Sequence, residues 1–128
     1  MKTSILCYIT AFLFIAATPT FAIDISGTYI CQGHAPGGEE YTDGVLTVIK
    51  SKNLYDFTWT FPKEKSSTKG TGVYNTEDES SIAVLFTFQP PTPKEIGVII
   101  YKVSNGTIKG NAILSGKKII GGEICTKK

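Results

Sequence analysis

The sequence contains no arginine: its thirteen basic residues are all lysines, and eleven acidic residues bring the formal net charge to +2. Arginine is the usual residue for bidentate contacts with phosphates and with base edges. Its absence, together with the near-neutral charge, argues against a nucleic-acid partner. A charged membrane surface is no better supported.

Residue types that carry catalysis are also scarce. His34 is the single histidine, which excludes a two-histidine metal cage or proton relay. No serine or threonine lies in a recognisable nucleophile elbow, and no pair of facing carboxylates can be assigned. We therefore predict no catalytic residue, no metal site and no cofactor, and hence a protein that is not an enzyme.

Only three cysteines are present. Cys7 lies in residues 1–22, where Lys2 precedes an apolar run over residues 5–17 and Ala22 is a small residue at the expected cleavage point. These are the features of a secretory signal peptide. The apolar run is shorter than the ~20 residues that a spanning helix needs, so we expect no membrane span in the mature form. Residues 23–128 should then form one secreted or periplasmic domain.

Loss of Cys7 would leave Cys31 and Cys125 as an even pair in an exported chain, which indicates a disulfide. Such a bridge would join the start of the domain to its end. In the chain-entropy model, a crosslink over a loop of this length contributes roughly 4–5 kcal/mol.

Helical periodicity is absent from the mature sequence, whereas alternation with a period of two recurs throughout it. The clearest case is residues 54–61, where four rings occupy every second position. Asn105-Gly106 lies between two apolar stretches and predicts a hairpin with a type I′ turn. Eight strands are expected, at residues 24–32, 40–50, 54–61, 69–75, 82–89, 97–103, 107–114 and 118–126.

Eight strands at roughly ten-residue spacing, joined by short turns, predict an all-β fold. We expect a single antiparallel up-and-down meander that closes into a barrel, with a β-sandwich as the alternative. Pairing Cys31 with Cys125 raises a question of register, because both cysteines lie late in their strands. Three solutions stay open: a large stagger, continuation of the first strand into residues 33–40, or a strand count that is wrong by one.

Six aromatic residues are candidates for either the core or a ligand surface. As core, they would fill a small barrel; as a ligand surface, they would line a pocket or an exposed stripe. They are Tyr29, Tyr55, Phe57, Trp59, Phe61 and Tyr101.

Two turn regions are candidates for contact with a partner. One is the glycine-rich stretch near the histidine, and the other is the predicted last reversal. Their candidate contact residues are His34, Glu39, Glu40, Ser115, Gly116 and Lys117. Glu123 shares strand parity with Ile119 and Cys125, so its carboxylate can face the interior, where it would need a lysine partner or a place at the barrel mouth.

Short glycine–aromatic motifs resemble those of a group of small exported bacterial proteins, some of which are labelled fibronectin-binding. The resemblance spans nearly all of residues 23–128 and implies an all-β barrel, but carries over no catalytic residue. Its motifs are residues 27–29 (GTY), 57–59 (FTW), 70–74 (GTGVY), 97–101 (GVIIY), 106–110 (GTIKG) and 122–123 (GE).

The chain also resembles the periplasmic lysozyme-inhibitor barrels of the membrane-bound/C-type kind. Residues 29–31 (YIC) match an early Tyr-x-Cys, and Cys125 matches a late cysteine. Residues 115–118 (SGKK) begin like the inhibitory Ser-Gly-x-x-Tyr loop, but Ile119 replaces the tyrosine. No inhibitory role follows from this partial match.

From these observations we predict an exported, non-enzymatic binding protein. Its barrel loops would contact another protein or an extracellular macromolecule. Two alternatives stay open: a secreted inhibitor of a lysozyme or protease that inserts a turn into the enzyme's cleft, and a small-ligand carrier with an aromatic barrel interior. A filled interior would exclude the carrier.

Overall fold

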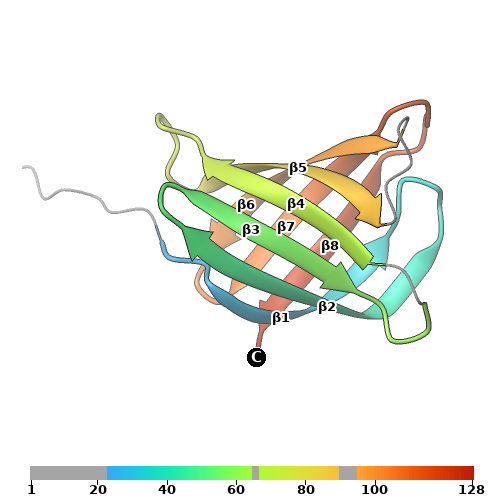
Figure 1. Ribbon diagram of the computed structural model, residues 1–128, viewed down its shortest axis with the longest axis horizontal. Coiled ribbons are helices and arrows are strands. Elements are labelled where there is room, and N and C mark those ends of the chain that lie inside the picture. The colour runs from blue at the N-terminus through green and yellow to red at the C-terminus, as the bar shows by residue number, and fades with distance from the viewer. Residues whose placement is uncertain (1–22, 65–66, 90–94) are drawn as a thin grey trace, which may run out of the picture.

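The computed structural model describes residues 23–64, 67–89 and 95–128. In these residues the chain forms eight antiparallel strands, each paired with its neighbours in sequence and closed into a barrel by pairing of the first with the last (Figure 1). The predicted meander and closed barrel are therefore confirmed. The strands are β1 (Gly27–His34), β2 (Glu40–Ser51), β3 (Leu54–Thr60), β4 (Ser67–Tyr74), β5 (Ser81–Gln89), β6 (Ile96–Ser104), β7 (Thr107–Leu114) and β8 (Gly121–Lys127).

Two sequence predictions lie outside the described residues: the signal peptide at residues 1–22 and the proline-rich connector at residues 90–93. Within the described ranges, no helix is long and apolar enough to cross a membrane.

The barrel closes where β1 pairs with β8. Cys31 lies opposite Cys125 with a Cα–Cα distance of 4.1 Å, and the two form a disulfide, as predicted. The pairing continues to His34 opposite Gly122, so continuation of the first strand is the correct solution to the register question. Gly33 makes this continuation possible, because a Cβ there would lie 2.0 Å from the carbonyl oxygen of Gly122.

Residues 23–26, which precede β1, insert the Ile25 side chain into one end of the barrel. The Ile25 side chain is only 1% exposed within the core. The Tyr29 hydroxyl donates a hydrogen bond to the Ile25 carbonyl (2.8 Å), and the Tyr74 hydroxyl donates one to the Ile23 carbonyl. These contacts place the segment across the end that carries the β2–β3 and β4–β5 turns (Figure 1).

Large rings pack against strand positions that have no side chain. A Cβ on Gly97 would lie 2.0 Å from Cζ of Phe86, and a Cβ on Gly110 would lie 2.5 Å from Cδ1 of Tyr101. The Phe57 and Tyr101 rings stack with their centroids 6.0 Å apart. The glycine–aromatic motifs of the sequence are thus a packing device, in which each glycine leaves room for a neighbouring ring.

One predicted turn and one predicted strand boundary need correction. Asn105-Gly106 does connect β6 to β7, but only Gly106 has positive φ (73°), so the turn is not type I′. Positive φ at the second central residue alone is the pattern of a type II turn. The last strand begins at Gly121, later than predicted, because residues 118–120 belong to the β7–β8 loop.

Candidate functional site

The end of the barrel opposite residues 23–26 holds a cavity of about 370 Å³. It lies beneath the β1–β2 and β7–β8 loops and is open to solvent at its mouth. Small-molecule sites in proteins usually enclose about 300–1,000 Å³. The barrel interior is therefore filled at one end and hollow at the other. From the sequence, a filled interior and a ligand-binding interior stayed open as alternatives for the whole barrel.

Aromatic rings form much of the cavity wall. The Trp59 and Phe86 rings meet edge to face with centroids 6.1 Å apart, and Phe86 meets Phe88 in the same way at 6.0 Å. Directly after β3, Phe61 packs against Tyr41 with ring centroids 5.2 Å apart. Ile99, Ala112 and Leu114 complete the apolar part of the wall.

A single carboxylate lies at the floor of this cavity. Glu123 is 7% exposed, and its Oε1 accepts hydrogen bonds from Trp59 Nε1 (3.0 Å) and from the Tyr101 hydroxyl. Its Oε2 accepts one from the Tyr41 hydroxyl (2.5 Å). All three partners donate, so Glu123 acts only as a hydrogen-bond acceptor in this arrangement.

Glycines lie on both sides of Glu123 in the barrel wall. Glu123 pairs with Gly110 of β7 and with Gly33 of β1. Beyond these glycines, Tyr101 of β6 pairs with Gly110, and Tyr41 of β2 pairs with Gly33. The five residues form one row across five strands, and the Tyr101 ring lies over Gly110, where a side chain would occupy its place.

The environment of the two tyrosines keeps their hydroxyls protonated. Burial raises the pKa of Tyr41 well above its usual value, and the charge of Glu123 and the hydrogen bond to it raise it further. Burial likewise raises the pKa of Tyr101, with Glu123 as the next cause. Both phenols therefore remain hydrogen-bond donors over the physiological pH range.

The disulfide lies beside this carboxylate. The sulfur atoms of Cys31 and Cys125 and a carboxylate oxygen of Glu123 all lie within 4.8 Å of one another. Both sulfurs are bonded to each other, so neither offers a thiolate to a metal ion. In the oxidised protein, this cluster can provide only the Glu123 carboxylate as a ligand.

Four of the predicted contact residues lie at the mouth of the cavity: His34, Glu39, Glu40 and Lys117. Nε2 of His34 lies 3.0 Å from the Ile120 carbonyl oxygen, which ties the end of β1 to the β7–β8 loop. Ser115 and Gly116 form the turn after β7 and do not line the cavity.

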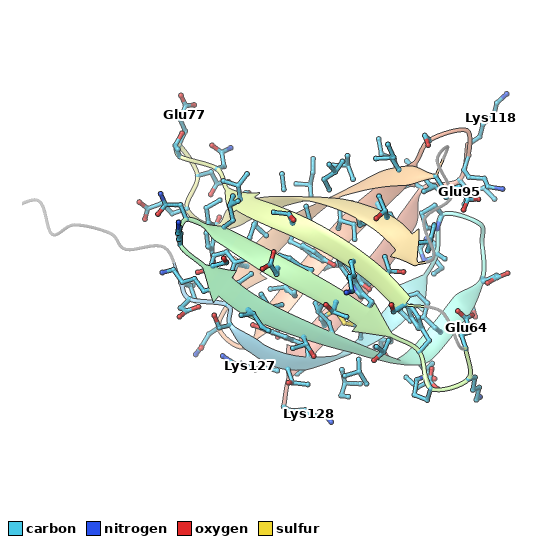
Figure 2. All side chains as sticks on the ribbon, in the orientation of Figure 1. Glu64, Glu77, Glu95, Lys118, Lys127 and Lys128 are labelled. Atoms are coloured by element: carbon cyan, nitrogen blue, oxygen red, sulfur yellow. A yellow bond between two sulfur atoms is a disulfide. The ribbon has the colours of Figure 1, made fainter. Side chains whose placement is uncertain are left out.

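Glu64 and Glu95 also line the cavity. In Figure 2 they lie at the same end of the barrel as Lys118, and Glu77 lies at the opposite end.

The predicted aromatic set divides between core and cavity. Tyr29, Tyr55, Phe57 and Tyr101 are buried in the core, whereas Trp59 and Phe61 line the cavity. Glu123 does face the interior, but its partners are two tyrosines and a tryptophan rather than a lysine.

Sequence reasoning did not single out several of the lining residues, among them Tyr41, Thr68, Phe86 and Phe88. The two phenylalanines alternate in β5, but the apolar residues on both faces of that strand concealed which ones point inward.

No family model matches the chain, and a search of curated proteins found no match. The resemblances to exported bacterial barrels and to lysozyme inhibitors therefore stay predictions.

Proposed function

We propose that the protein is a non-enzymatic binding protein that holds a small, largely apolar molecule in the open half of its barrel. The cavity is the observation that carries this proposal: it has a ligand-sized volume of about 370 Å³, ring-lined walls and one polar group at its floor. Small-molecule sites commonly combine mostly apolar walls with a few well-placed polar groups. Among the alternatives that the sequence left open, this arrangement favours the carrier.

The chain provides its own reporter for a test, because its single tryptophan, Trp59, lines the cavity. The probe is N-phenylnaphthylamine, a neutral dye that becomes fluorescent in apolar surroundings. We expect saturable binding at one site per chain, accompanied by a change in Trp59 fluorescence. Isothermal titration calorimetry provides an independent measure of the stoichiometry.

Two matched substitutions distinguish the cavity from the outer surface. Ala112 in β7 lines the cavity, so A112F should fill it and weaken dye binding by at least about tenfold. Ala83 in β5 is exposed on the barrel exterior, so A83F makes the same chemical change outside the cavity and should leave binding unchanged. Equal dye binding by both variants and the wild type would contradict the proposal.

A macromolecular partner is a second candidate, favoured by the β7–β8 loop at the cavity mouth. Ile119 and Ile120 in this loop are 53% and 62% exposed, and two apolar side chains exposed side by side suit contact with another protein. The inhibitor form of this candidate is testable with a C-type lysozyme. Inhibition that disappears when residues 115–118 are replaced would support it, and full lysozyme activity at saturating protein would exclude it.

We also propose that the protein works outside the cytosol, after removal of residues 1–22. The Cys31–Cys125 disulfide supports this, because such bonds persist in oxidising compartments. Mass spectrometry of the protein recovered from the periplasm or medium should give a chain that begins at Ile23. A full-length chain in the cytosol would contradict the proposal.

A further inference from the structure

We infer that the ligand of the barrel cavity is an organic cation, a protonated amine attached to an apolar body about the size of one ring and a short chain. This inference rests on the proposed function and specifies its ligand class. It follows from the acceptor capacity of Glu123, its lack of a charged partner, and the composition of the cavity around it.

The Glu123 carboxylate has one acceptor position left. A carboxylate offers about four lone-pair positions. Oε1 uses two of its positions, for Trp59 Nε1 and the Tyr101 hydroxyl, whereas Oε2 uses only one, for the Tyr41 hydroxyl. The free position thus lies on the Oε2 side of a side chain that contributes to the cavity lining.

The charge of Glu123 has no cationic partner in the described part of the chain. Its three hydrogen-bond donors are neutral groups, and no lysine or histidine of that part forms an ion pair with it. A buried charge without an opposite charge nearby is costly, and an added opposite charge reduces that cost where its geometry and hydrogen bonds are good. An ammonium group at Oε2 would supply both the fourth hydrogen bond and the missing positive charge.

The remaining cavity favours a cation over an anion or a neutral molecule. Trp59 and Tyr41 line the cavity and donate their N–H and O–H groups to the carboxylate, so it is the strongest acceptor that they leave within reach of a ligand. At the mouth, three glutamates outnumber the one lysine of the lining, Lys117, and this negative charge favours the approach of a cation. The glutamates are Glu39, Glu40 and Glu64. An anion would face the carboxylate directly, and an alcohol would satisfy the free acceptor without balancing its charge.

The test compares three compounds that share one apolar body: phenylbutylamine, phenylbutanol and phenylbutanoate. Each compound is titrated at neutral pH into wild-type protein that carries N-phenylnaphthylamine, and displacement of the dye is measured. We expect the amine to bind at least about tenfold more tightly than the alcohol and the carboxylate to bind most weakly. An alcohol that binds as well as the amine overturns the inference but leaves the proposed function standing. Failure of the dye and all three compounds to bind overturns both.

Two substitutions test whether Glu123 is the source of the preference. E123Q removes the charge and should bring the amine to within about threefold of the alcohol. Tyr41→Phe keeps the charge and frees a second position on Oε2, so it should retain or increase the preference. Because E123Q leaves three donors around an amide and can fail to fold, circular dichroism accompanies it. Loss of the amine preference in Tyr41→Phe would overturn the inference on its own.

Discussion

The Glu123 carboxylate and the two tyrosines that bind it depend on residues that contribute no side-chain atoms. Gly110 and Gly33 flank Glu123 in the barrel wall, and the Tyr101 ring lies over Gly110. A side chain at either glycine would occupy the space that a ring or a neighbouring strand now fills. At the scale of single residues, the site is therefore specified by glycines as much as by its polar groups.

Gly110→Ala tests this dependence. Its Cβ would lie 2.5 Å from the Tyr101 ring and 2.7 Å from the Ile100 carbonyl oxygen, so both must shift. We expect the free energy of unfolding, measured with urea, to fall by about 1–3 kcal/mol. Gly37→Ala is the matched control, because nothing lies within 4 Å of a Cβ at that loop position. Equal stability of the two variants would contradict the requirement for glycine at position 110.

The tyrosines also predict how stability depends on alkaline pH. Burial raises the pKa of Tyr74 to about 12, and the pKa of Tyr41 and Tyr101 is raised as well. Above pH 10, tyrosines of the unfolded chain lose protons that the folded protein retains, so the unfolded state binds fewer protons. Stability should therefore be fully present below about pH 10 and should decrease as pH rises toward 12 and beyond.

Urea unfolding at a series of pH values, combined with the ultraviolet absorbance of tyrosinate, measures this effect. Tyr74→Phe removes one of the responsible groups, so its stability should decrease less steeply above pH 10. A wild-type protein whose tyrosines all ionise near pH 10 without loss of stability would contradict the prediction.

At the scale of elements, β1 and β8 form the pair on which barrel closure depends. The disulfide between Cys31 and Cys125 crosses this pair and spans a sequence separation of 94 residues. Reduction, or the double substitution C31A/C125A, should lower the free energy of unfolding by about 4–5 kcal/mol, because the unfolded chain regains the freedom that the crosslink removes. Urea titrations with and without reductant measure the difference, and coincident curves would contradict it.

The strands could be predicted from the sequence because alternation and turn residues are local signals. Period-two patterns, one continuous apolar run and the turn residues between them located all eight strands, and the cysteine pair indicated which two strands meet. The register of that pair was beyond local reasoning, since it depends on Gly33 allowing β1 to continue alongside Gly122. The type I′ turn was wrong because Asn-Gly also suits turns with positive φ at glycine alone.

The candidate site was only partly predictable for a similar reason. Strand parity directed Glu123 inward, but its partners come from β2, β3 and β6, which no spacing in the sequence relates to β8. The cavity itself depends on how rings from different strands share the interior. That distribution is a property of packing, so the sequence left open whether the barrel was filled.

At the scale of the whole molecule, the two ends of the barrel have separate tasks. The end containing Ile25 is packed and supports stability, whereas the end containing Trp59 is hollow. Ile25→Ala should lower the free energy of unfolding by about 2–4 kcal/mol, because the side chain is fully buried. Ile23→Ala is the control, since that side chain is 48% exposed and should have little effect.

Neither substitution touches the cavity, so dye affinity should stay within about twofold of the wild-type value for both variants while they are folded. Urea unfolding and dye titration on the same samples measure the two properties side by side. A fall in affinity that parallels the loss of stability in Ile25→Ala would show that the two ends are coupled.

Ile25 is buried in the far end of the barrel, and the mouth of the cavity lies at the opposite end. A ligand bound in this cavity enters and leaves past the β1–β2 and β7–β8 loops. Stiffening those loops would slow arrival and departure together and leave the equilibrium constant nearly unchanged. Substitutions in these two loops can therefore change the residence time of the ligand without altering any group that binds it.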